Sequence, residues 1–244
     1  PDVTFISHSK PSWDGKPALP APLKEPPAAA AGSREQLERA VQYYNAAPTA
    51  PVAPVPRARG PRLLVVADRH IASLTRFAPQ YTRVLGAADM KLQDALGRVK
   101  AGLIHTRAQH IILMLGRNDL GLGKGEVQYF LTEIVTSLLL QNGDATVWLS
   151  TIPPIKERNH ISKLIVDYNR LVWSVYLYFK KKIPTKVSII RAFDWCRSKI
   201  PYPAVKVGFF DLENRLNKMG ADHFYYMALK ELGMPELARI EEIE

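Results

Sequence analysis

The feature that most constrains this chain is the stretch of residues 61–73, PRLLVVADRHIAS. Residues 63–67 form a compact apolar run typical of a buried strand, and Asp68, Arg69 and His70 then turn the chain into a helix. Ligands of open α/β sheets usually sit outside the carboxyl ends of the strands. The sequence therefore places a candidate site at the end of this first strand.

A second strand pattern leads to the same edge. Residues 110–115 are apolar and run into Gly116, Arg117, Asn118 and Asp119. From residue 61 onward strand patterns alternate with helix patterns, which indicates a three-layer α/β/α, flavodoxin-like fold with about five parallel strands. We expect strands at 63–67, 81–85, 110–115, 144–151 and 187–191, and helices at 71–77, 90–103, 127–140, 159–179 and 216–232.

Composition divides the chain into three parts. Residues 1–60 are rich in Pro and Ala, and repeated Pro predicts an extended arm. Within the arm, residues 33–46 combine a capping-box pattern with apolar side chains at helical spacing, so a short helix is expected there. Such a helix docks either on its own domain or on a protein partner. Residues 61–235 then form the α/β domain, and residues 236–244 form an acidic tail.

The chain is basic, with 33 Lys and Arg against 23 Asp and Glu and a net charge of +10. Basic surfaces attract polyanions such as nucleic acid. Lys180, Lys181, Lys182 and Lys186 follow aromatic residues, and they are candidates for contacts with RNA phosphates. The alternative is a solvated helix end, where lysines interact favourably with the helix dipole.

Several classes of site are not indicated. No apolar run approaches the length of about eighteen residues that a membrane span needs, and the start at Pro1 shows no signal peptide, so we expect an intracellular protein, cytoplasmic or nuclear. The single cysteine, Cys196, allows no intrachain disulfide and no cysteine-based zinc site, and we expect it to be buried. The GLGKG run at 121–125 is expected to be a loop and lacks the ending of a phosphate-binding loop. The six His show no metal-ligand spacing, so neither a cofactor nor a metal is expected.

The two strand ends resemble the first and third sequence blocks of the SGNH or GDSL hydrolases. The resemblance covers about residues 62–232 and implies the SGNH type of α/β/α fold. In that family the residue after the first Asp is the nucleophilic Ser, and here that position is Arg69. A guanidinium cannot accept an acyl group, because that step needs a hydroxyl or thiol. Gly86 and Asn118 match the family positions that bind the oxyanion.

The last family block, which carries the catalytic Asp and His, fits in two registers. The segment from Leu216 to Gly220 matches the family's Leu-Asn-x-x-Gly pattern, and this register places Arg215 at the His position. The alternative register takes His223 as the family His and loses that match. We favour the first register, in which both the Ser and the His are replaced.

These replacements predict a domain that is not an enzyme and that serves as a binding module in a ribonucleoprotein or another multiprotein complex. The alternative is an active esterase or deacetylase with unusual catalytic residues, including His223. Arg69, Arg117 and Arg215 are expected at one cleft, where guanidinium groups favour a phosphate or carboxylate. Alternatively, each Arg pairs with a local carboxylate. His70 is interpreted either as an exposed group at the turn or as a structural histidine.

Overall fold

The computed structural model describes residues 62–104, 108–155, 160–197 and 206–234, together with Glu38 and Gln42. Glu38 and Gln42 fall within the helix predicted at 33–46, and both are helical and exposed. The rest of the predicted arm and the predicted acidic tail lie outside the described residues.

Five parallel strands form one sheet in the order β2-β1-β3-β4-β5. This confirms the predicted fold class. Because β1 lies between β2 and β3, the strand order reverses there, and Ala67 at the end of β1 faces both Gly86 and Met114. The strands are β1 (Leu63–Ala67), β2 (Thr82–Gly86), β3 (His110–Met114), β4 (Thr146–Ser150) and β5 (Val187–Ile190).

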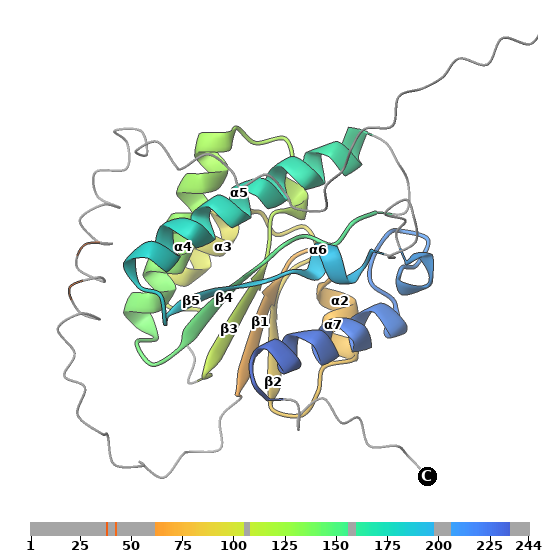
Figure 1. Cartoon of the computed structure of the whole chain (residues 1–244), viewed down its shortest axis with the longest axis horizontal. Helices are drawn as coiled ribbons and strands as arrows, with labels where there is room; N and C mark the ends of the chain where they lie inside the picture. Colours follow the sequence, from red (N-terminus) through yellow and green to blue (C-terminus); the bar gives the residue numbers. More distant parts are fainter. Residues whose placement is uncertain are drawn as a thin grey trace, which may run out of the picture.

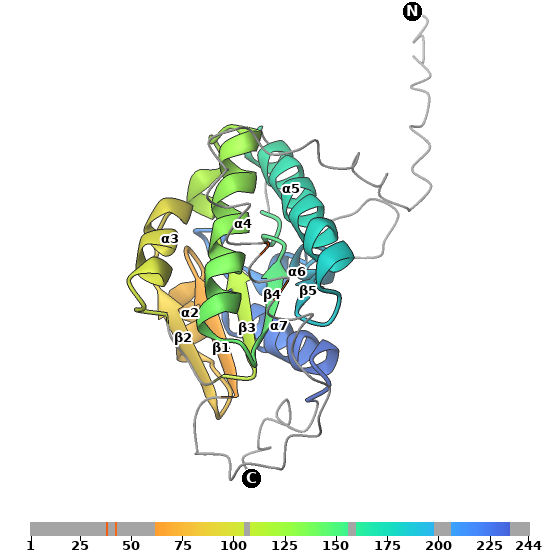
Figure 2. The same cartoon turned by 90° about the vertical axis from the view of Figure 1, so that its left-hand side faces the viewer.

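Helices cover both faces of the sheet. Figure 1 shows α4 and α5 on one side and α2 and α7 on the other, and Figure 2 shows α3, α4 and α5 side by side. Successive side chains of a strand point to opposite faces, so Leu64 packs under α3, α4 and α5 whereas Leu63 packs under α2, α6 and α7. The helices are α2 (Ile71–Arg76), α3 (Leu92–Lys100), α4 (Lys124–Gln141), α5 (His160–Lys182), α6 (Ala192–Trp195) and α7 (Lys218–Glu231), with the 3-10 turns η2 (Arg117–Asp119) and η3 (Val207–Phe209).

The predicted strands and long helices are all present, with shifted ends. The largest difference is at 121–125, which was expected to be a loop. Helix α4 already begins at Lys124, because the Glu126 carboxylate accepts a hydrogen bond from the Gly123 N–H and caps the first turn. Helix α3 ends at Lys100, before a glycine turn, so Leu103 is 68% exposed instead of lying on the predicted apolar face. Within the described part of the chain, no helix is long and apolar enough to cross a membrane.

Candidate active site

Asp68 fixes the loops at the carboxyl ends of β1 and β3. Its Oδ1 accepts a hydrogen bond from the Arg69 N–H at 2.6 Å. Its Oδ2 accepts from the Gly116 N–H at 2.9 Å and the Arg117 N–H at 2.7 Å. One carboxylate therefore holds two loops that lie 48 residues apart in the sequence.

Burial and hydrogen bonding act on Asp68 in opposite directions. Its side chain is 1% exposed, and loss of hydration raises the pKa of the carboxyl to about 6. The three backbone N–H groups favour the ionised form and lower the pKa, but they offset only part of the effect of burial. The negative charge of Asp119 raises the pKa further.

Two glycines allow the backbone to pack closely at this edge. Gly116 has φ of 103°, and a side chain there would overlap the ring of Tyr168, whose hydroxyl donates to the Leu115 carbonyl at 2.8 Å. Gly86 has φ of 142°, and a Cβ at this position would overlap the carbonyl oxygen of Ala67. The resemblance assigned Gly86 to oxyanion binding, and the structure gives it a packing role as well.

Arg69 and Arg117 lie together at the mouth of the site, because Asp68 binds the backbone N–H of each. Arg69 donates one long hydrogen bond, 3.4 Å from its Nη2 to the Glu213 carbonyl, and its buried Nε has no partner among the described residues. The buried Nη1 of Arg117 likewise has none. Desolvation lowers the pKa of Arg117, and the positive charge of Arg69 lowers it further. The local carboxylates therefore leave guanidinium N–H groups of both arginines unbound.

Arg215, the third predicted arginine, is paired with neighbouring carboxylates. Its Nε lies 2.9 Å from Asp211 Oδ2, and its Nη1 lies 3.0 Å from Glu213 Oε2. Asp211 also accepts the backbone N–H groups of Glu213 and Arg215. Desolvation alone would raise the pKa of Asp211, but these hydrogen bonds lower it below its ordinary value. Arg215 therefore pairs with Asp211 and Glu213 within its own loop, and these two carboxylates are not paired with Arg69 or Arg117.

His70 is buried and joins the first turn to the last helix. Its Nδ1 accepts a hydrogen bond from the Leu216 N–H at 3.2 Å. Burial lowers the pKa of His70 to about 3, and the positive charges of Arg117 and Arg69 add to the effect. The imidazole is therefore neutral at pH 7, and because Nδ1 is an acceptor, the proton is on Nε2. With its lone pair in use, His70 is a structural histidine, and the interpretation of an exposed group is wrong.

Asn118 lies at the predicted edge, but its amide is engaged elsewhere. Its Nδ2 donates to the Ala88 carbonyl at 2.9 Å and to the Met90 carbonyl at 3.0 Å. The next residue, Asp119, accepts the Leu92 N–H at 3.0 Å. Both side chains hold the loop before α3 against η2, so the amide is not directed at an oxyanion in this arrangement.

The lysine candidates lie near the amino end of β5, whereas the arginines follow the carboxyl ends of β1 and β3. Lys180, Lys181 and Lys182 form the last turn of α5, which ends beside the start of β5 (Figure 1). Lys180 donates to the Pro184 carbonyl at 3.0 Å, and Lys186 donates to the Gly143 carbonyl at 2.8 Å. They do not form one surface with the arginines. RNA binding by these lysines stays a prediction.

His223 stands on α7, apart from the Asp68 cluster. The centroid of its ring lies 4.8 Å from that of Phe209, and burial lowers its pKa. The positive charge of Lys206 lowers the pKa further. The structure therefore does not bring His223 to the residues of the first and third blocks.

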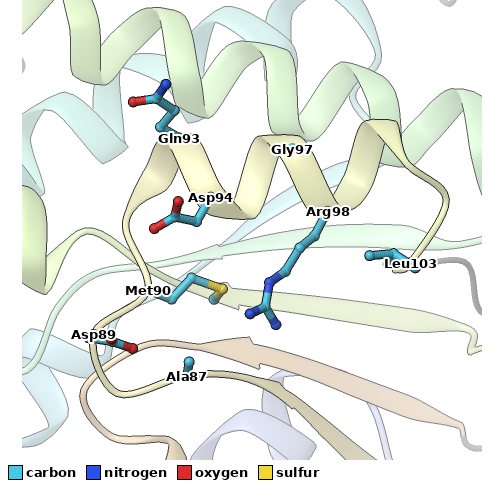
Figure 3. Close-up of a pocket in the computed structure, with 8 residues that line it drawn as sticks. All are labelled: Ala87, Asp89, Met90, Gln93, Asp94, Gly97, Arg98 and Leu103. Carbon is cyan, nitrogen blue, oxygen red and sulfur yellow. The ribbon is translucent and has the colours of Figure 1, made fainter.

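A hollow of about 550 Å³ lies beside α3, and none of the predicted site residues lines it. Figure 3 shows Arg98 reaching from α3 towards Met90 and Ala87, with Asp89 nearby. We place the candidate site at the Asp68 edge, because unpartnered polar atoms and perturbed pKa values gather there. No group of three or more His, Cys, Asp or Glu in the described ranges is arranged to hold a metal ion.

The fold is that of a three-layer α/β protein, and the candidate site lies at the carboxyl ends of β1 and β3. Comparison with solved structures makes this more specific. A GDSL-like lipase from Bacteroides thetaiotaomicron is 15% identical, with a TM-score of 0.57 over 82% of this chain and 98% of the lipase. A lipase/acylhydrolase from Enterococcus faecalis is 14% identical, with a TM-score of 0.52, and the match covers 70% of this chain and 95% of that protein. An acetyl xylan esterase from Geobacillus stearothermophilus is 16% identical, with a TM-score of 0.50 over 72% and 95%.

At these identities the likeness establishes the fold, and the chain has an SGNH/GDSL-like fold, as the resemblance predicted. No protein-family model and no curated protein matches the sequence. The prediction that the chain is not an enzyme is contradicted, because the solved structures that share its fold are lipases, acylhydrolases and esterases. The prediction relied on residue types at two motif positions, whereas hydrolases in general also use oriented N–H donors and charged groups to stabilise developing charge.

Proposed function

We propose that this chain is an esterase or deacetylase of the SGNH type with unusual catalytic residues. The observation that carries the proposal is the position of Arg69. Its backbone is fixed by Asp68 at the end of β1, and its partly exposed guanidinium retains free N–H groups. A guanidinium at this point can stabilise the negative charge that develops on a carbonyl oxygen during ester hydrolysis.

In this proposal a water molecule attacks the carbonyl carbon, solvent water takes up its proton, and the alcohol leaves as the acyl–oxygen bond breaks. Arg69 offers no hydroxyl, and the lone pair of His70 Nδ1 is bound to Leu216. The carboxylate of Asp68 is enclosed by three backbone N–H groups. The site therefore supplies charge stabilisation without a Ser–His relay. In serine proteases, binding and oxyanion stabilisation alone retain a rate about 10³–10⁴ times that of the reaction in water, so we expect a slow enzyme.

The test is hydrolysis of p-nitrophenyl acetate by the full chain, followed against buffer and against three variants. Arg69→Gln removes the charge and keeps much of the volume, and we expect it to lower kcat/KM at least tenfold. Arg69→Lys keeps the charge without the guanidinium geometry, so it should retain part of the rate. Arg83→Gln makes the same charge change on the exposed part of β2 and should leave the rate unaltered.

The proposal is overturned by two results. A wild-type rate equal to that of buffer would exclude hydrolysis of this ester class by the domain. A wild-type rate that survives Arg69→Gln would place the catalytic group elsewhere. Circular dichroism of each variant shows whether a lost rate reflects unfolding.

A further inference from the structure

Arg69 and Arg117 make up a pair of cationic side chains whose hydrogen-bonding capacity is not used within the described protein. A guanidinium has five N–H donors. Arg69 uses one of them in a long bond to the Glu213 carbonyl, and Arg117 makes no side-chain hydrogen bond or ion pair with any described residue. Both Arg69 Nε and Arg117 Nη1 are buried.

The carboxylates nearby do not fill these positions. Asp68 contributes a negative charge, but its oxygens already accept three backbone N–H groups. Asp211 and Glu213 are bound to Arg215. The surrounding charge is therefore partly balanced, while the guanidinium N–H groups lack acceptor oxygens. A buried donor without an acceptor costs about 1–3 kcal/mol. Both arginines are partly exposed, so an acceptor from outside the fold can reach the remaining N–H groups.

We infer that Arg69 and Arg117 form a binding site for a single small oxyanion, a carboxylate or a phosphate group carried by a ligand. The fork of a guanidinium matches two oxygens of either group. The backbone of both arginines is held by one carboxylate, so the pair is organised before the ligand arrives. That this ligand is the substrate or the acid product rests on the proposed function, whereas the binding itself does not.

A small anion fits this site better than a nucleic acid. A polyanion binds along a track of basic groups spaced to follow its phosphates. Here the lysines of α5 lie near the amino end of β5, away from the carboxyl ends of β1 and β3. The third arginine of the cluster, Arg215, is paired with Asp211 and Glu213. The free donors are thus confined to two neighbouring side chains.

The test is titration calorimetry and thermal unfolding of the full chain with inorganic phosphate and with acetate, at an ionic strength kept constant with chloride. At about ten times Kd we expect Tm to rise by about 3–5 °C. Arg117→Gln and Arg69→Gln should each weaken binding at least tenfold. The matched control, Arg83→Gln, removes an exposed arginine of β2 and should bind as the wild type does.

The outcomes separate cleanly. An equal response to phosphate and acetate in all four proteins would be a general salt effect and would overturn the inference. The inference would also be overturned if an RNA oligonucleotide bound in a way that depends on the two arginines and neither small anion bound. The site would then bind a polyanion. Loss of anion binding in the two site variants supports the inference even if no ester is hydrolysed, so its fate is independent of the enzymatic proposal.

Discussion

Asp68 should make the stability of this protein fall as pH rises through the weakly acidic range. The folded-state pKa is raised from 3.8 to about 6 by burial, so the folded protein holds this proton more tightly than the unfolded chain does. Each pKa unit corresponds to about 1.4 kcal/mol, which gives a total of about 3 kcal/mol lost as pH rises from about 3 to about 7. About 1.4 kcal/mol of this loss falls between pH 5 and pH 7.

The difference between wild type and Asp68→Asn isolates this contribution. Asn is close in shape and does not titrate. The unfolding free energy of the wild type should therefore fall by about 1.4 kcal/mol relative to that of Asp68→Asn between pH 5 and pH 7. The raw curve would not show it, because His70 acts in the opposite direction: its pKa is lowered to about 3, so its stabilising effect grows as pH rises. The assay is urea unfolding at several pH values.

Asp211→Asn is the matched control. The pKa of Asp211 is lowered, so its contribution is complete above the unfolded value and is lost only at lower pH. Its gap to the wild type should therefore stay flat between pH 5 and pH 7. The reasoning about Asp68 is refuted if the wild type gains on Asp68→Asn as pH rises, because the three backbone N–H groups would then outweigh burial.

Three further predictions concern single positions. Because burial depresses the pKa of His70, the stability of the wild type relative to His70→Gln should fall as pH drops from about 6.5 towards 3. Urea unfolding of both proteins across this range measures the difference, and a constant difference would contradict the prediction. Gly116→Ala should destabilise the protein by about 2–4 kcal/mol, because φ is 103° and the new Cβ would overlap the Tyr168 ring. Unfolding in guanidinium chloride measures this, and a midpoint equal to that of the wild type would show that the loop adapts freely. His223→Ala should leave the hydrolysis of p-nitrophenyl acetate unaltered, since His223 lies beside Phe209 and Lys206, and a loss of the rate with retained circular dichroism would restore the alternative register.

The sheet could be predicted from the sequence because its strands are covered on both faces. Each strand then reads as a short continuous apolar run, as in LLVVA of β1 and HIILM of β3. Strand ends follow directly from where these runs stop. The short helix α6 and the turn η3 have no such periodicity, and neither was predicted.

The position of Asp68 at the carboxyl end of β1 could be predicted from the sequence, but its hydrogen bonds could not. That Asp68 lies at a sheet edge follows from the strand before it, whereas its acceptance of the Gly116 N–H depends on how two distant loops meet. A local pattern such as a capping box predicts a side-chain contact to nearby backbone, but no such pattern predicts a contact to backbone 48 residues away. The same limit applies to Asn118, whose residue type suits an oxyanion but whose amide binds the carbonyls of Ala88 and Met90.

The three N–H groups that Asp68 binds all belong to the main chain. Any residue except proline supplies the same group, so the loops do not depend on which side chains positions 69 and 117 carry. These positions are therefore suited to saturation mutagenesis, since replacements there change the chemistry presented at the sheet edge while the attachment of the loops is kept. New ligand preferences can therefore be selected at two positions, one in each loop, that are neighbours in space, without redesign of the core.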